Sequence, residues 1–95
     1  MAHSETLDID GSPVAVEFLG RCGARYTEDG RTMSIDGAML TGAADFMIFV
    51  GTIIQWDDGE RVSVDKRKRI VSNIARYAAS RGWVVEFRAP LRPDA

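Results

Sequence analysis

Residues 46–87 read FMIFVGTIIQWDDGERVSVDKRKRIVSNIARYAASRGWVVEF, and the order of patterns in this stretch decides the fold. It holds an apolar run, an acidic turn, a segment with helical periodicity, a glycine and a second apolar run. Short apolar runs rich in aromatic and β-branched residues are typical of strands, whereas a 3.6-residue period is typical of an amphipathic helix. The stretch therefore predicts a strand, a helix and a strand.

The helix is predicted at residues 64–81. Apolar side chains recur there at steps of three and four residues and share one face: Ile70, Val71, Ile74, Tyr77 and Ala78. Ser63 or Asp65 can cap the first turn, and Gly82 suits the left-handed residue that follows many helices. Trp83 is then expected to fold back over the last turn.

The flanking strands are predicted at residues 46–54, with an interruption at Gly51, and at residues 83–87. The alternative for the first run is a buried helix. Gly51 and the β-branched pair Ile53 and Ile54 favour the strand over that alternative.

Two hairpins are predicted upstream, because alternating apolar residues flank Asp10-Gly11 and Asp29-Gly30, dipeptides that suit tight turns. The first joins residues 6–9 to 14–18, and the second joins residues 25–28 to 31–35. Pro13 lacks an amide hydrogen, which indicates an edge strand. Asp36-Gly37 predicts another turn, and residues 38–45 predict a loop.

These patterns predict one α+β domain spanning residues 1–95, with residues 1–5 and 89–95 as frayed tails. We expect an antiparallel sheet of four to six strands. One long amphipathic helix near the carboxyl terminus packs on one face of this sheet and is followed by a final strand.

Composition indicates an ordinary globular protein of the cytoplasm. The 95 residues are 45% apolar and 27% charged, and no apolar run approaches the length of a membrane span. The amino terminus lacks the apolar core of a signal peptide. A single cysteine, Cys22, cannot form an internal disulfide, which suits a reducing compartment, and we expect it to be a packed side chain.

Charge is divided unevenly along the chain. Residues 1–60 hold eleven acidic residues and three arginines, a net charge of −8, whereas residues 61–95 hold nine basic and three acidic residues, a net charge of +6. Such a division fits a basic helix beside an acidic sheet, or a binding surface that attracts a partner of opposite charge.

No pattern of a catalytic, cofactor or metal site is found. The only histidine is His3, and the chain has no zinc-ligand cluster, phosphate-binding glycine loop or nucleophile elbow. Asp57 and Asp58 are explained by a turn. The run from Lys66 to Arg69 fans around a helix, so we expect a solvated helix start rather than a nucleic-acid groove.

Three further features carry a family resemblance: Ile53-Ile54-Gln55-Trp56-Asp57 after an apolar strand, Lys68-Arg69-Ile70-Val71-Ser72-Asn73-Ile74 in the helix, and Gly82 before the last strand. With Asp29-Gly30-Arg31 and Met39-Leu40, they resemble the immunity protein 74 family of bacterial polymorphic toxin systems. The resemblance extends over roughly residues 17–87. It implies a cytosolic protein without catalytic residues that binds a cognate toxin domain and blocks it.

The first candidate for the toxin interface is Trp56 with Asp57, Asp58 and Glu60, since an aromatic side chain among charges is typical of interface hot spots. Glu28 and Asp29 form a second candidate because hairpin tips are exposed. Trp56 can instead pack over the helix start. Two other functions stay open: a nucleic-acid-binding regulator that uses Lys66, Arg67, Arg69 and Arg76, and a homodimer that pairs through an edge near Pro13.

Overall fold

The computed structural model describes residues 6–19, 23–40 and 42–88 and has the predicted α+β architecture. Its elements are β1 (Leu7–Ile9), β2 (Ser12–Phe18), β3 (Ala24–Glu28), β4 (Arg31–Ile35), β5 (Gly37–Met39), β6 (Phe46–Phe49), the 3-10 turn η2 (Val50–Thr52), α1 (Val64–Ser80) and β7 (Val85–Arg88). Cys22, His3 and the predicted tails lie outside the described residues.

The first four strands form an antiparallel sheet in the order β1-β2-β3-β4. Both predicted hairpins are confirmed, with Ile9 opposite Ser12 and Glu28 opposite Arg31. The two-residue turns have φ values of 52° and 88° at Asp10-Gly11 and of 53° and 80° at Asp29-Gly30. Positive φ at both central residues defines the turn type that matches the twist of paired strands.

Two predictions for this region are wrong. Pro13 does not lie on an edge strand, since β2 is paired on both sides and Pro13 lies opposite Asp8 of β1. A proline is tolerated here because β3 ends at Glu28, opposite Val14, so no residue of β3 lies opposite Pro13 and requires its amide hydrogen. Its carbonyl accepts a bond from the Asp29 amide (3.2 Å). Asp36-Gly37 does not reverse the chain either, because Gly37 already begins β5 of a second sheet.

The second sheet has the order β5-β6-β7 and mixes both orientations, since β5 and β6 are antiparallel and β6 and β7 are parallel. A parallel pair needs a long crossover, and α1 supplies it between β6 and β7. The strand–helix–strand prediction is thus confirmed, but the first strand ends at Phe49 and continues as η2. Part of the predicted loop at residues 38–45 is in fact strand, because β5 pairs with β6.

Helix α1 begins and ends as its sequence predicts. The Ser63 side chain accepts a hydrogen bond from the Lys66 amide (3.0 Å), and Gly82 adopts a φ of 76° just after the helix. The Trp83 amide donates to the Ala78 carbonyl (2.9 Å), so the chain folds back over the last turn.

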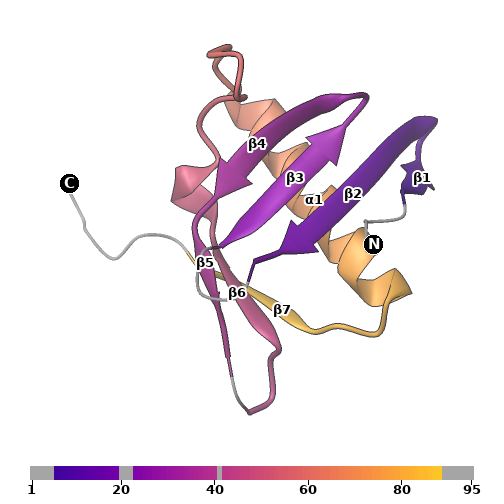
Figure 1. Ribbon diagram of the computed structural model, residues 1–95, viewed down its shortest axis with the longest axis vertical. Helices are drawn as coiled ribbons and strands as arrows, with labels where there is room; N and C mark the ends of the chain where they lie inside the picture. The colour runs from indigo at the N-terminus through magenta and orange to yellow at the C-terminus, as the bar shows by residue number, and fades with distance from the viewer. Residues whose placement is uncertain (1–5, 20–22, 41, 89–95) are drawn as a thin grey trace.

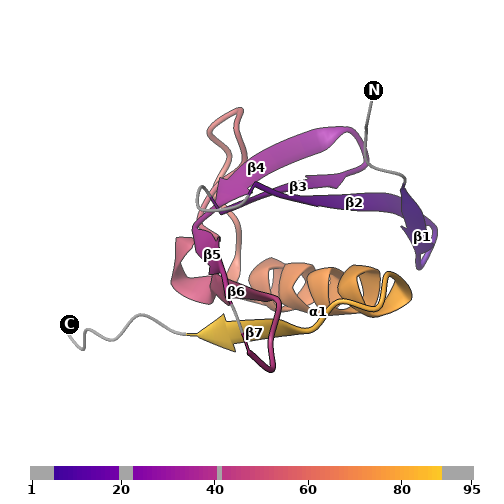
Figure 2. The same cartoon turned by 60° about the horizontal axis from the view of Figure 1, so that its bottom comes forward.

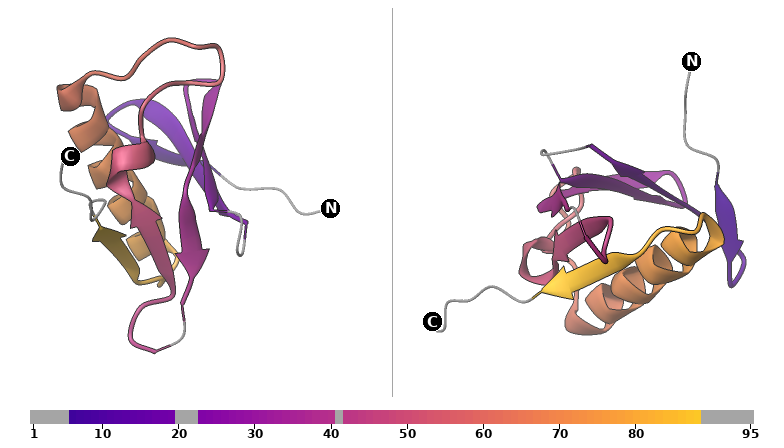
Figure 3. Two further views of the ribbon diagram at one scale, coloured as in Figure 1. Left: turned by 90° about the vertical axis from the view of Figure 1, so that its left-hand side faces the viewer. Right: turned by 90° about the horizontal axis from the view of Figure 1, so that it is seen from below.

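The helix buries its predicted face against the four-stranded sheet. Ile70 and Ile74 are fully buried, and Tyr77 and Ala78 are nearly so. Figure 1 shows α1 behind this sheet, and Figure 2 shows the helix below it, with β7 alongside the helix. The second sheet turns away from the first and lies to one side of the helix, as Figure 3 shows. The face of the helix that points away from the four-stranded sheet stays exposed.

Candidate functional site

The loop that connects η2 to α1 is folded tightly against the edge of β4. Gln55 and Arg61 form an isolated bridge, and the Trp56 amide donates to the Glu60 carbonyl (2.9 Å). The Asp57 amide donates to the Thr32 carbonyl of β4 (2.9 Å). Because backbone hydrogen bonds join the two arms of this loop to each other and to the sheet, residues 54–61 form a projection whose shape is fixed before any partner binds.

Trp56 is buried in this loop, with only 4% of its surface exposed. Its ring lies 6.2 Å from the Tyr26 ring, and the Arg31 guanidinium lies over it at 4.6 Å. The structure therefore supports a packed Trp56, and its ring contacts are with β3 and β4 of the sheet. The side chain holds the loop onto the sheet and leaves little surface for direct contact with a partner.

Asp57, Asp58 and Glu60 are exposed, but each has an arginine partner. Asp57 pairs with Arg25 (2.9 Å), and Arg31 contacts both Asp58 (3.2 Å) and Glu60. The Glu60 amide, more than the Arg31 charge, keeps the pKa of Asp58 below its usual value. The structure thus brings the three predicted acids together as an ordered ion-pair cluster rather than as an isolated negative patch.

Of the second candidate pair, only Asp29 is exposed. Glu28 is buried, with 9% of its surface exposed, because its side chain faces α1 and not the solvent at the hairpin tip. Its carboxylate accepts bonds from Lys66 (2.7 Å) and from the Tyr26 hydroxyl (2.7 Å), which in turn accepts a bond from Asn73 (2.9 Å).

This buried network shifts two pKa values. Burial raises the pKa of the Tyr26 phenol far above its usual value. Burial would also raise the pKa of Glu28, but the hydrogen bonds from Lys66 and Tyr26 and the charges of Lys66 and Arg69 outweigh it and lower that pKa. Glu28 is therefore an ionised structural group that joins β3 to the helix.

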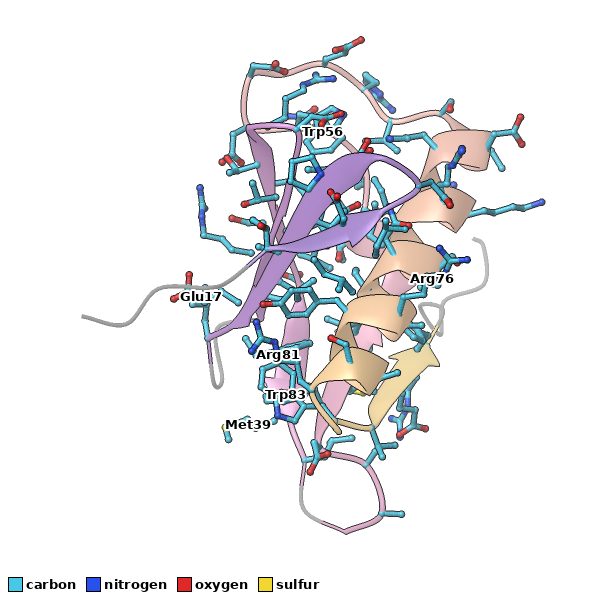
Figure 4. The ribbon with its side chains drawn as sticks, turned by 90° about the vertical axis from the view of Figure 1, so that its right-hand side faces the viewer. Glu17, Met39, Trp56, Arg76, Arg81 and Trp83 are labelled. Atoms are coloured by element: carbon cyan, nitrogen blue, oxygen red, sulfur yellow. The ribbon has the colours of Figure 1, made fainter. Side chains whose placement is uncertain are left out.

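The two sides of the molecule carry opposite charge. The outer side of the four-stranded sheet and the loop hold six exposed acids: Asp8, Glu17, Asp29, Asp57, Asp58 and Glu60. Three arginines belong to the same surface, Arg25 and Arg31 of the ion-pair cluster and Arg61 of the loop, so acids are in excess there. The helix side is basic, and Figure 4 shows Glu17 and Arg76 on opposite sides. Within the described ranges, no ion pair involves Arg61, Arg67, Lys68 or Arg69.

Comparison with protein-family models matches residues 19–88 to the family described as Immunity protein 74. The chain belongs to the immunity protein 74 family. The match covers β3 to β7, including the loop and the helix, and leaves out β1 and β2. No curated protein and no solved structure matches the chain.

Sequence reasoning missed one surface of this immunity protein 74 family member. At the end of the molecule where the two sheets diverge, the Phe18 and Phe46 rings stack at 3.9 Å and Trp83 meets both edge-on. Met39 lies opposite Phe46 on β5 and is 60% exposed, and Figure 4 shows it beside Trp83. The missing signal was the pairing of β5 with β6, which places Met39 next to rings distant in sequence.

Two features are absent from the described part of this family member. No group of three or more potential metal-binding side chains lies together there. None of the helices described is long and apolar enough to cross a membrane.

Proposed function

We propose that this protein protects its cell by binding a cognate toxin domain in the cytoplasm and blocking it by direct contact. The observation that carries the proposal is the match to the immunity protein family over residues 19–88. In this role the chain inhibits by occupying a surface of the toxin and has no turnover of its own.

The surface that we propose for toxin binding is the loop at residues 54–61 together with the outer side of the four-stranded sheet. The loop supports this choice because its hydrogen bonds and ion pairs order it in the free protein. A surface that is ordered in advance loses little conformational entropy on binding, so more of the interaction energy appears as affinity. Ile54, which is 45% exposed, adds apolar area beside the acids.

The charge of this surface indicates the chemistry of its partner. Six acids against three arginines leave a net negative side, so a basic surface of the toxin would be attracted to it. A toxin that acts on nucleic acid would have such a basic surface, and covering it would also exclude its substrate. Exposed charges of this kind mainly accelerate association, whereas buried contacts slow dissociation.

The alternative of a nucleic-acid-binding regulator receives less support. Of the four cations that it would use, Lys66 is held by Glu28 (2.7 Å) and Arg76 lies 3.6 Å from Asp10. Their partners would compete with phosphate groups for the same cations. Arg67 and Arg69 remain, a small footprint for binding to a nucleic-acid backbone.

The proposal is tested by expressing the chain with the toxin encoded beside its gene and by measuring binding of the purified pair. We expect the wild-type chain to restore growth of cells that express the toxin. The double variant Asp57→Lys with Asp58→Lys should associate with the toxin more slowly, and its association rate should depend less on salt. Asp36→Lys makes the same kind of charge change at the junction of the two sheets and serves as the control.

Two outcomes would contradict the proposal. If the wild-type chain neither restores growth nor binds the toxin, the inhibitory function is wrong. If it restores growth and the loop variant binds like Asp36→Lys, the function stands and the assigned surface is wrong. Trp56→Ala is not used as a probe of contact, because the loss of a buried indole disturbs the fold.

A further inference from the structure

Strand β7 has a free edge. It pairs with β6 on one side, and no strand pairs with its other side among the residues that the structure describes. The Val84 carbonyl accepts a hydrogen bond from the Phe46 amide of β6 (3.3 Å). Alternate residues of a strand face the same neighbour, so Glu86 and Arg88 also direct their backbone groups to β6. Val85 and Phe87 direct theirs to the free edge.

The side chains beside this edge carry opposite charges two residues apart. Arg88 contacts Glu86 at 3.1 Å, and both side chains are about half exposed. Edge strands are often protected from pairing by charges of one sign, which repel any added strand. A pair of opposite charges does not protect the edge from every added strand. It repels a strand that pairs in one register and attracts a strand that pairs in another.

We propose that a second copy of this chain pairs antiparallel along the free edge of β7, with Phe87 of each copy opposite the other at a twofold axis. The backbone groups of Phe87 face outward in both copies, so this position forms a hydrogen-bonded pair. Glu86 of each copy then lies opposite Arg88 of the other at the adjacent non-hydrogen-bonded positions. Side chains are closest at such positions, and opposite charges there stabilise the pairing.

The same charges disfavour a parallel arrangement. Parallel pairing in register would place Glu86 against Glu86 and Arg88 against Arg88, and like charges directly opposite each other are destabilising. The face that carries these charges also exposes Val84, at 53%, beside a shallow hollow lined by Leu40, Ala43 and Ala44. This apolar area next to the edge would be partly covered by a second copy.

The expected association is weak, because one short strand buries less surface than most stable interfaces. It concerns the chain alone and does not rest on the proposed toxin binding. The test is sedimentation velocity of the full chain across micromolar to millimolar concentrations, with Glu86→Arg and Arg88→Glu. Each variant alone places like charges at both cross-strand positions. We therefore expect each variant to raise the concentration at the midpoint of self-association at least tenfold.

Mixing the two variants provides the decisive control. One variant then carries two arginines at these positions and the other carries two glutamates, so every cross-strand pair of a mixed dimer is opposite in charge. Native mass spectrometry should therefore detect the mixed dimer in preference to either homodimer. Hydrogen exchange provides a readout that does not depend on the variants. The amide of Phe87 should become more protected as the wild-type concentration rises, whereas that of Glu86, which already faces β6, should not.

A wild-type chain that stays monomeric at millimolar concentration would overturn the proposal. So would a dimer that both variants form as well as the wild type, or self-association that leaves the Phe87 amide unprotected. If Glu86→Arg leaves self-association unchanged but abolishes binding to the toxin, this edge belongs to the toxin and not to a second copy.

Discussion

Replacing Ile74 with alanine tests the placement of the helix on the sheet. Ile74 is fully buried in the centre of the helix face, with no exposed surface. The substitution removes three carbon atoms, which at about 0.8 kcal/mol each corresponds to about 2.4 kcal/mol of lost burial. The cavity that remains adds to this loss, and buried changes of this kind reduce the free energy of unfolding by about 2–5 kcal/mol in total.

Ile54→Ala is the matched control, because it makes the same chemical change at a residue that is 45% exposed. We expect it to reduce the free energy of unfolding by less than about 1 kcal/mol. Both variants are compared with the wild type in urea unfolding monitored by tryptophan fluorescence and by helical circular dichroism. If Ile74→Ala loses less than about 0.5 kcal/mol, in the range of a surface change, the helix does not bury this face and the description of the core is wrong.

Three further results are expected. Because the pKa of Glu28 is lowered in the folded state, its contribution to stability is complete above the usual glutamate pKa of about 4.3 and is lost as the pH falls below it. The stability difference between wild type and Glu28→Gln should therefore shrink on acidification, and a difference that grows in acid would contradict this assignment. Arg31→Met should accelerate hydrogen exchange at the Gly59 and Glu60 amides while changing global stability little, since its ion-pair partners are exposed. Unchanged exchange in the loop would mean that Arg31 does not order it. Dialysis against a chelator should leave the melting temperature unchanged, and a fall that a divalent ion reverses would show that the acidic turns bind metal.

The local elements were predictable because nearby residues determine them. Ser63 and Gly82 supply the groups that begin and end a helix, and Asp10-Gly11 and Asp29-Gly30 adopt the backbone angles of two-residue turns. The buried face of α1 follows from its periodicity alone. These features depend on contacts between residues a few positions apart, which a single sequence displays directly.

The candidate site was less predictable because it depends on contacts between distant residues. The acids of the loop looked like a free negative patch, since nothing near them in the sequence indicates that Arg25 and Arg31 reach them from β3 and β4. Glu28 lies beside a hairpin tip, and its burial is explained by its bonds to Tyr26 and to Lys66, which is 38 residues away. The second sheet was missed for the same reason. It is completed by the parallel pairing of β6 and β7, which lie before and after the helix in the sequence.

The most direct test of the central claim is a titration of the cognate toxin domain with the purified chain while the activity of the toxin is measured. Tight binding predicts that activity falls linearly and reaches its baseline at one equivalent of the chain. The loop variant Asp57→Lys with Asp58→Lys should require an excess to reach the same baseline, and Asp36→Lys should behave as the wild type. Full toxin activity in the presence of excess folded wild-type chain would contradict the account.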